Sequence, residues 1–318
     1  MQNNRPCVCV LMSTYNGEKY IEEQIDSIFC QNDVEVTLVI RDDESTDDTI
    51  NIIKSIKKKH NSYHIVLHCG KNIGVHKSFK KLVLKAPEYD YYAFADQDDI
   101  WYPDKLHIAV SSIENIEGVA LYASNQMCVD GDGNDLFLRF DKGSNPQSLL
   151  VQSLLDNRLS GCTMLFNADL MKHLQKIYSV YNKPMMHDSI CSILAQSIGE
   201  LIYDPEPRMS FRRHGNNVTS EKTYSESSIK GKIDIYKHKA RTFVKYLNNS
   251  RAVSTLASKI LTSFESEISN DAADVLKYFS NYYKNSRTWM KASFNNKYYD
   301  YFPEPKWTTQ MKFVLRVM

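Results

Sequence analysis

The first 125 residues alternate between short apolar runs and longer stretches in which apolar residues recur at helical spacing. The apolar runs have the length of buried β-strands, and they predict strands over Val8–Met12, Val36–Ile40, His64–Leu67, Tyr91–Ala95 and Val119–Ala123. The intervening stretches predict helices with apolar faces at Ile21, Ile25, Ile28 and Phe29, at Ile50, Ile53 and Ile56, and over Val75–Leu84. This alternation indicates an α/β fold with a Rossmann-like, mostly parallel sheet flanked by helices.

Polar segments follow three of these predicted strands directly. Ser13–Gly17 comes after the first strand, Arg41–Asp43 after the second and Asp96–Asp99 after the fourth. In parallel sheets, ligands bind beyond the carboxyl ends of the strands, which meet at one edge. The sequence therefore predicts a single site on that edge of the sheet.

From about residue 225 the pattern changes. Three stretches, 227–248, 251–268 and 271–292, have few Gly or Pro and many Tyr and Lys, and they predict a small helical C-terminal region. Residues 1–220 hold 22 Lys and Arg against 29 Asp and Glu, a net charge of −7, whereas residues 221–318 hold 17 against 9, a net of +8. The asymmetry indicates either two functional regions or two differently solvated surfaces, and the acidic front part argues against a nucleic-acid partner.

Hydrophobic residues make up 42% of the chain and charged residues 24%, as in ordinary soluble folded proteins. The seven cysteines include no CxxC pair, which is typical of small buried thiols in a reducing compartment. No apolar run approaches the roughly 18–20 residues needed to cross a bilayer, and the first residues lack the apolar core of a signal peptide. We therefore expect a cytoplasmic protein, or one that lies peripherally on the inner face of the plasma membrane.

The acidic segment Asp96-Gln97-Asp98-Asp99 carries the strongest chemical signal. Three carboxylates in four residues repel one another unless a cation or several hydrogen bonds hold them. Mg²⁺ and Mn²⁺ prefer such oxygen ligands, and Mg²⁺ is commonly shared between one or two carboxylates and substrate phosphates. The segment therefore favours a metal that bridges a diphosphate, although a solvated acidic turn that caps the following helix is an equal alternative.

Three further segments have both a chemical and a structural interpretation. The acidic run Asp42–Thr49 offers carboxylates to a nucleobase or a ribose, but acids and hydroxyls are also favoured at a helix start. Asp188, in His187-Asp188, can deprotonate an acceptor hydroxyl, or it can cap the helix that follows. The segment Phe211–Asn217 offers Arg213 to phosphate oxygens and His214 to a metal, but it is also typical of an exposed basic loop.

Taken in order, these residues resemble the family 2 glycosyltransferases, which are inverting enzymes with the GT-A fold. The resemblance covers roughly residues 6–218. Ser13-Thr14-Tyr15-Asn16 is similar to the opening nucleotide loop of the family, and Asp42-Asp43-x-Ser45-x-Asp47-x-Thr49 to its nucleoside-binding acidic motif. Asn72-Ile73-Gly74 is similar to a short loop that members carry after the third strand, and Asp96-x-Asp98-Asp99 with Trp101 to the metal-binding region.

The second half of the resemblance concerns the acceptor side. Gly161-Cys162-Thr163 resembles the glycine-bearing segment that lines the sugar and acceptor site, and His187-Asp188 resembles the pair that contains the catalytic acid residue. Arg213-His214-Gly215-Asn216-Asn217 resembles the mobile loop of bacterial rhamnosyltransferase-like members. Two positions depart from the family pattern: Glu44 replaces a usual Gly, and Ser189 replaces a frequent aromatic residue.

The resemblance implies a role for each matching residue. Asp188 is the expected general base, and Asp98 and His214 are the expected ligands of Mn²⁺ or Mg²⁺. The expected nucleotide and donor contacts are Thr14, Tyr15, Asn16, Glu18, Asp42, Asp43, Asn72, Gly74, Asp96, Gln97 and Arg213. The expected acceptor-side residues are Trp101, Gly161, Cys162 and His187.

The resemblance also implies the organisation and the reaction. We expect a catalytic domain over 1–222, with a nucleotide-binding half over 1–125 and an acceptor half over 126–222, followed by a helical region over 223–318. The expected reaction moves a sugar from a nucleoside diphosphate, of the dTDP-rhamnose or UDP-hexose type, to a hydroxyl of a glycan or lipid-linked acceptor in bacterial surface polysaccharide synthesis. The basic C-terminal region would suit contact with an anionic membrane, or simply pack on the catalytic domain.

Two alternative functions are disfavoured by particular residues. A nucleotidyltransferase would share the nucleotide and the metal, but no glycine-rich, Lys-containing phosphate loop follows the first strand. A nucleotide-sugar-binding module without turnover would need to keep neither Asp98 nor Asp188, and both are present.

Overall fold

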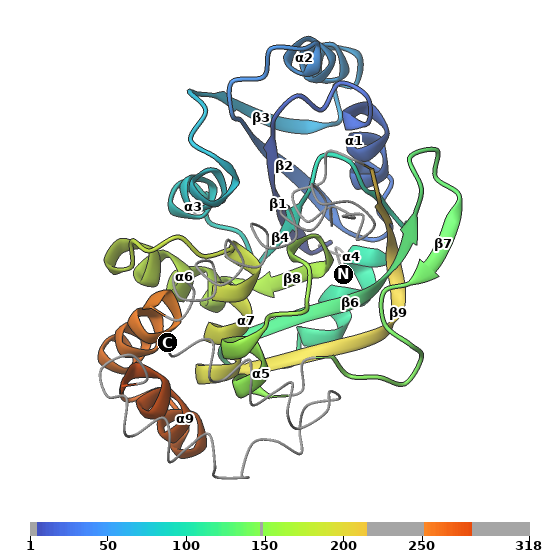
Figure 1. The fold of residues 1–318 in the computed structure, drawn as a ribbon. Coiled ribbons are helices and arrows are strands. Elements are labelled where there is room, and N and C mark those ends of the chain that lie inside the picture. Colours follow the sequence, from blue (N-terminus) through green and yellow to red (C-terminus); the bar gives the residue numbers. More distant parts are fainter. Residues whose placement is uncertain (1–4, 147–148, 215–250, 282–318) are drawn as a thin grey trace, which may run out of the picture.

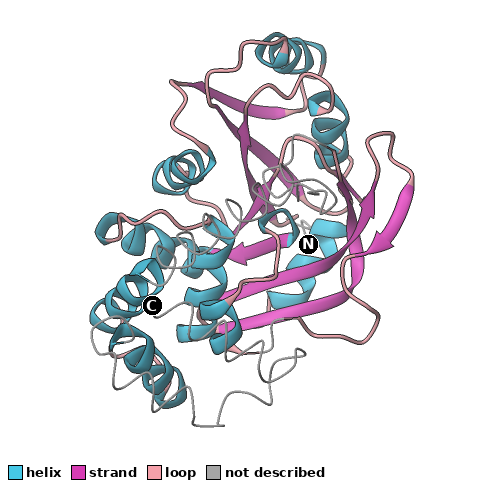
Figure 2. Ribbon diagram, in the orientation of Figure 1, coloured by secondary structure: helices cyan, strands magenta, loops and turns pink. Residues whose placement is uncertain are grey.

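The fold of the chain is known from a computed structural model, which describes residues 5–146, 149–214 and 251–281 (Figure 1). A nine-stranded mixed sheet runs through the molecule in the order β3-β2-β1-β4-β8-β6-β9-β5, and β7 pairs with β6. Helices cover both faces of this sheet (Figure 2). The predicted α/β class with a Rossmann-like sheet is confirmed.

The nucleotide half follows the predicted alternation closely. Its strands β1 (Cys7–Thr14), β2 (Glu35–Asp42), β3 (His64–Cys69) and β4 (Tyr91–Ala95) pair in parallel. The helices α1 (Ile21–Phe29), α2 (Thr49–Lys59) and α3 (Val75–Lys85) connect them. All seven elements were predicted from the hydrophobic pattern, because the strands are short apolar runs, buried except at the edge strand β3, and each helix buries one apolar stripe.

Side chains alternate between the two faces of these strands, and each face has its own core. Val8, Val10 and Met12 of β1 pack with α1 and α2, whereas Cys9 and Leu11 pack with α3. This alternation is the period of two that a pleated strand imposes. The two cores fix the carboxyl ends of β1, β2 and β4 on one edge, as predicted.

The part of the chain from Ile100 onward, which includes the predicted acceptor half, is less regular, and here the sheet becomes mixed. Its strands are β5 (Ile100–Trp101), β6 (Ala120–Val129), β7 (Asp135–Leu138), β8 (Met164–Asn167) and β9 (Glu200–Arg212). Strand β8 lies between β4 and β6 and is antiparallel to both. The predicted fifth strand is therefore present as part of β6, but it does not continue the parallel series. A four-residue insertion such as β8 leaves too short a pattern to be recognised in the sequence.

The remaining helices surround this half. They are α4 (Lys105–Ile113), α5 (Leu150–Leu155), the 3-10 turn η1 (Gly161–Thr163), α6 (Ala168–Val180), α7 (His187–Ile198), a helix at 251–263 and α9 (Asn270–Asn281). No helix in the described ranges is long and apolar enough to cross a membrane.

The two described C-terminal helices belong to the main core. Leu256 and Ile260 of the helix at 251–263, Phe264 directly after it, and Leu276 and Phe279 of α9 are buried in the cluster that also contains apolar residues of α5, α6 and α7. These two helices thus pack on the catalytic domain. The predicted helix over 227–248, the rest of the stretch 271–292 and the boundary at 222 lie outside the described residues, so the domain limits stay a prediction.

Candidate active site

The loop after β1 is fastened to the acidic loop after β4. The backbone N–H of Tyr15 donates to Oε1 of Gln97 at 2.8 Å, and Nε2 of Gln97 donates to the carbonyl of Tyr15 at 3.1 Å. Gly17 sits against the same amide, and any Cβ at this position would overlap the Gln97 side chain. Gln97, predicted to contact the donor, therefore has a structural partner. The ring of Tyr15 is 48% exposed and is available to a ligand.

Asn16 and Glu18 bind the loop after β2. Oδ1 of Asn16 accepts from the N–H of Thr46 at 2.8 Å, and Oε2 of Glu18 accepts from the N–H of Asp48 at 2.9 Å. Both residues thus bind backbone N–H groups of the segment before α2, while Asp47 of the acidic run accepts from the N–H of Thr49 at 3.1 Å, as the structural interpretation of the run predicts. Their predicted contacts with the donor stay a prediction.

The side chains of Thr14 and Asp42 are hydrogen-bonded to each other. Oδ2 of Asp42 accepts from the Thr14 hydroxyl at 3.0 Å, and Oδ1 accepts from the N–H of Ser45 at 2.9 Å. Asp42 is completely buried and Thr14 nearly so. These two residues shape the nucleotide loop from within, and a direct ligand contact by either would require the loop to move.

Asp43 organises the loop after β3. Its carboxylate accepts from the backbone N–H of Ile73 at 2.8 Å and of Gly74 at 2.7 Å, and it pairs with the Arg41 guanidinium at 2.5 Å. Asp43 and the segment Asn72–Gly74, which were both predicted to contact the nucleotide or donor, are therefore in contact with each other, although about thirty residues separate them. Gly74 has a φ of 82°, in the left-handed region that favours glycine.

The departure at Glu44 has a clear structural basis. Glu44 has a φ of 70°, a conformation that favours the Gly usually found here in the family and that costs energy for a residue with a Cβ. Its side chain offers compensation, because Oε2 accepts from the N–H of Asn72 at 3.0 Å. The turn therefore keeps its shape, and the glutamate links it to the loop after β3.

The two predicted metal ligands meet, although 116 residues separate them. Oδ2 of Asp98 lies 2.8 Å from Nε2 of His214, and the His214 ring stacks on Tyr20 with centroids 5.1 Å apart. The carboxylate of Asp98 is an oxygen ligand of the kind that Mn²⁺ and Mg²⁺ take, and the imidazole of His214 beside it offers a nitrogen ligand. Gly215, Asn216 and Asn217, which complete the predicted loop, lie outside the described residues.

Asp96 lies in the field of two other acids. Burial, together with the charges of Asp98 and Asp188, raises the pKa of Asp96 to about 7. Carboxylates that come from β4 and from the start of α7 are therefore close enough to interact. Such a group of acids is stabilised by a cation at the same place.

Arg212 was not singled out by the sequence, yet it holds the acidic loop in place. Its Nε donates to the carbonyl of Asp98 at 3.1 Å, its backbone N–H to Oδ1 of Asp99 at 3.2 Å, and Nη2 to Glu23 of α1 at 2.6 Å. The guanidinium is 4.6 Å from the centroid of Tyr20. In contrast, Arg213, which was predicted to clamp the diphosphate, lies 5.5 Å over the ring of Phe137. Its predicted role stays untested.

A buried charged cluster lies behind the acidic loop. Ligand atoms of Asp96, Asp99 and Cys162 lie within 4.8 Å of one another. Burial raises the pKa of the Cys162 thiol and, with the charges of Asp98 and Asp96, that of Asp99, whereas burial lowers the pKa of Lys105 to about 8. Because a lysine already supplies positive charge here and a thiol is a soft ligand, the pair Asp98 and His214 fits Mn²⁺ or Mg²⁺ better than this cluster.

Trp101 forms one wall of that cluster. Its ring is buried and Nζ of Lys105 lies 4.6 Å from the ring centroid. The predicted acceptor contact of Trp101 would require its ring to be uncovered. Cys162 is similarly buried, so both residues shape the site from behind in this structure.

Asp188 lies in the first turn of α7 (His187–Ile198), and burial raises its pKa to about 6, against the opposing effect of hydrogen bonds from Ser189 and from the backbone of Gly161. A carboxylate with this pKa is ionised at neutral pH and is a stronger base than an exposed aspartate. Gly161 and Asp188, predicted to share the acceptor side, are thus in contact.

His187 supports this arrangement from the core. Its side chain is 3% exposed and stacks on Phe79 with ring centroids 3.7 Å apart. Neither ring nitrogen has a hydrogen-bond partner among the described residues, and burial lowers the pKa of His187 to about 3. A Cβ on Gly161 would overlap the imidazole. His187 is therefore neutral and sets the distance between α7 and η1.

Together these groups bring the pair of Asp98 and His214, the carboxylate of Asp96 and Asp188 of the adjoining helix to one part of the molecule. The model of Glycosyl transferase family 2 matches residues 9–175. The dTDP-rhamnosyl transferase RfbG of Shigella flexneri is 32% identical over 215 residues, which cover 65% of this chain and 72% of that protein. The putative teichuronic acid biosynthesis glycosyltransferase TuaG of Bacillus subtilis is 31% identical over 163 residues, 51% of this chain and 62% of that protein.

Solved structures agree on the fold. The crystal structure of residues 1–349 of TarS from S. aureus, in complex with UDP-GlcNAc, superimposes with a TM-score of 0.59 at 19% identity and covers 98% of this chain and 81% of that one. At this identity the likeness establishes the GT-A glycosyltransferase fold alone. With the family match over more than half of the chain and the Shigella relative, the conclusion is direct: the chain belongs to glycosyl transferase family 2.

Proposed function

We propose that this family 2 glycosyltransferase transfers a sugar, with inversion, from a nucleoside diphosphate to an acceptor hydroxyl. One observation carries the proposal: His214 contacts Asp98 at 2.8 Å, beside Asp96, whose pKa is raised by burial and by the charges of Asp98 and Asp188. This arrangement supports a site in which Asp98 and His214 hold a metal and Asp188 acts as the base. The Shigella relative, named as a dTDP-rhamnosyl transferase, favours dTDP-rhamnose as donor, with a UDP-hexose as the second candidate.

The proposed nucleoside contact is centred on the exposed ring of Tyr15. Thr14 and Asp42 shape its loop, and Asp43 holds the adjoining loop through Ile73 and Gly74. A base stacked on Tyr15 gains contact area without disturbing these hydrogen bonds.

The proposed cation ligands are Asp98 and His214, with Asp96 beside them. A bound Mn²⁺ or Mg²⁺ supplies charge neutralisation to the departing diphosphate. The protein's own contribution is to keep the acidic loop fixed, through Arg212 on the carbonyl of Asp98 and the N–H bond to Asp99.

Asp188 is the proposed general base. It draws the proton from the acceptor hydroxyl as that oxygen attacks the anomeric carbon, and the bond to the diphosphate oxygen breaks on the opposite side. A single displacement inverts the centre and needs no protein nucleophile. Gly161 and the neutral His187 keep Asp188 in place.

For the acceptor and the setting, we propose a glycan or lipid-linked acceptor in bacterial surface polysaccharide synthesis, at the cytoplasmic side of the membrane. The name of the Bacillus relative, which refers to teichuronic acid biosynthesis, supports this class. Peripheral membrane contact through residues 300–318 would be tested by deleting them and measuring sedimentation with anionic liposomes. Unchanged binding would contradict that part of the proposal.

The central test is thermal-shift screening against UDP, dTDP, GDP and CDP, each with and without Mn²⁺. A ligand that binds only the folded state raises the melting temperature. We expect one diphosphate, dTDP or UDP, to stabilise the protein more strongly when Mn²⁺ is present. Incubation of the corresponding nucleotide sugar with a rhamnose- or hexose-accepting glycan should then release that diphosphate. No stabilisation by any of the four would contradict the proposed donor site.

A further inference from the structure

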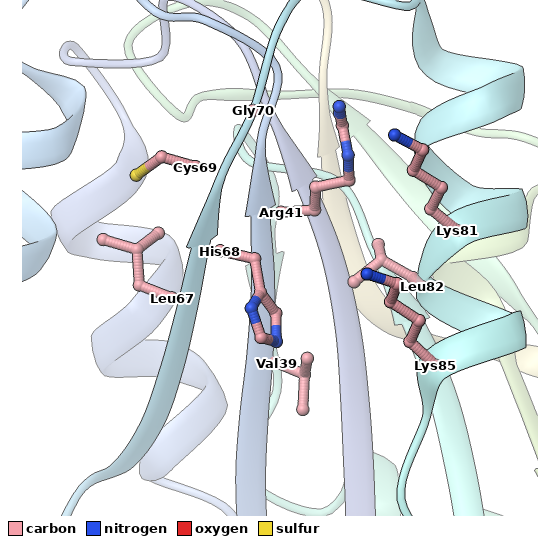
Figure 3. Close-up of a pocket in the computed structure, with 9 residues that line it drawn as sticks. All are labelled: Val39, Arg41, Leu67, His68, Cys69, Gly70, Lys81, Leu82 and Lys85. Carbon is pink, nitrogen blue, oxygen red and sulfur yellow. The ribbon is translucent and has the colours of Figure 1, made fainter.

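A cavity of about 340 Å³ lies between the edge strand β3 and α3, beyond the loops of the candidate active site (Figure 3). It exists because α3 packs on β1 and β2 through Phe79 and Leu82 and leaves the same face of β3 uncovered, where Val66 is 42% exposed. A cavity of this size is within the range of small-ligand pockets.

Basic side chains converge on this cavity from both walls. Lys81 and Lys85 of α3 extend toward it from one side, while Arg41 and His68 reach it from the strands (Figure 3). Val39 and Leu82 form an apolar base between them, and the side chains of Leu67 and Cys69 turn to the other side of β3. None of the described residues that line the cavity is acidic.

The positive charge of the two lysines is uncompensated within the described part of the chain. Lys81 and Lys85 lie one helical turn apart on α3, so their charges are close together. No ion pair or side-chain hydrogen bond joins either lysine to another described residue. Like charges at this spacing disfavour each other. An anion between them and the strand would relieve that repulsion.

Arg41 contributes directed donors. Its guanidinium is held rigidly by Asp43 at 2.5 Å, by Ser78 at 3.1 Å and by the carbonyl of Lys71 at 3.0 Å. These bonds use Nη1 and one N–H of Nη2, so Nε and the other N–H of Nη2 have no described partner. A fixed guanidinium next to flexible ammonium groups is suited to oxyanions.

We propose that this cavity binds a small phosphorylated ligand, with Lys81, Lys85 and Arg41 on the phosphate oxygens and Val39 and Leu82 against its apolar part. The ligand is bound without a divalent cation, which distinguishes this site from the proposed donor site at Asp98. The site does not depend on the proposed transfer reaction.

The experiment is calorimetric titration of the full chain with inorganic phosphate and with pyrophosphate, in the presence of a chelator. Lys81→Ala/Lys85→Ala should weaken binding roughly tenfold or more, because both charge-assisted contacts are lost. Lys54→Ala/Lys58→Ala is the matched control, since these exposed lysines have the same spacing on α2. Arg41 is left intact, because its removal would leave Asp43 buried without its partner.

Two further measurements show where on the protein the phosphate binds. Asp98→Asn should bind phosphate as the native chain does, so a failure of the proposed donor site would leave this result unchanged. Phosphate should also protect Lys81 and Lys85, but not Lys54 and Lys58, from acetylation detected by mass spectrometry. Preference for pyrophosphate would assign a diphosphate-bearing ligand, and equal binding a monophosphate. Equal affinities in both lysine variants, or no binding, would overturn the proposal.

Discussion

The nucleotide half and the acceptor half hold their polar residues in different ways. In the nucleotide half, Asn16, Asp42 and Asp43 are engaged in hydrogen bonds to neighbouring loops, so the fold itself accounts for them. In the acceptor half, Asp188 accepts hydrogen bonds from Ser189 and from the backbone of Gly161, whereas the nitrogens of the buried His187 have no described partner. Buried polar groups are normally paired. The acceptor half therefore leaves a buried imidazole unpaired beside the proposed base, whereas the nucleotide half uses its acids to build a rigid frame.

The largest expected effect tests the base. Asp188→Asn should lower kcat by about 10²–10⁴-fold, because general base catalysis contributes roughly this factor, while the donor still raises the melting temperature. The measurement is steady-state kinetics with thermal shift on the same preparations. Asp169→Asn, on the exposed start of α6, is the control and should keep normal turnover. Near-normal turnover of Asp188→Asn would show that burial in the acceptor half serves packing alone.

The second effect concerns the pair that joins the two halves. Asp98→Asn and His214→Ala should each raise the Mn²⁺ concentration for half-maximal activity by about 10–100-fold, since each removes one proposed ligand. Activity is measured across a Mn²⁺ titration after treatment with a chelator. Asp132→Asn, an exposed acid in the β6–β7 turn, should leave the titration unchanged. If all variants were equally active without a metal, the contact between Asp98 and His214 would have no role in metal binding.

The pH dependence sharpens the assignment of the base. Burial raises the pKa of Asp188 to about 6, and the base acts only when deprotonated. The rate should therefore be constant above pH 6 and fall roughly tenfold per pH unit below it. The measurement is kcat/KM against pH under saturating Mn²⁺, and the residual activity of Asp188→Asn should lack this acidic limb. If kcat/KM fell only near pH 4, where an exposed aspartate titrates, the result would contradict a buried base.

Packing behind the base can be tested through stability. Gly161→Ala should lower the free energy of unfolding by about 1–3 kcal/mol, as expected when an extra methyl group is forced into a packed site, because its Cβ would overlap His187. Urea denaturation measures the change. In Gly161→Ala/His187→Ala the clash is absent, so the two substitutions should be strongly non-additive. If the two effects were simply additive, His187 would not set the distance between α7 and η1.

The smallest effect belongs to the nucleotide half. Glu44→Ala keeps the positive φ but loses the hydrogen bond to Asn72, and should cost about 0.5–1.5 kcal/mol. Glu44→Gly loses the same bond but relieves the backbone, and should cost clearly less. Both are measured by urea denaturation. An equal cost for the two variants would show that Glu44 is not strained.

Most of the nucleotide half could be predicted from its sequence because its strands and helices are long enough to show their period. The same pattern placed three polar segments on one edge, and Asp98 with His214 were chosen correctly as neighbours. The acceptor half could not be derived so fully. β8 has four residues, and nothing in the sequence shows that it runs antiparallel between β4 and β6.

What the sequence determined by itself was the class of fold, the family and the chemical types gathered on one edge, because these depend on local periodicity and on motif order. Only the tertiary structure decided which of those residues are engaged. It assigned Arg212 to the acidic loop, turned Arg213 to Phe137 and placed Lys105 behind Asp99. Arg212 ends β9 and Arg213 follows it, and which of the two side chains meets the acidic loop depends on how β9 pairs with strands that are distant in the sequence.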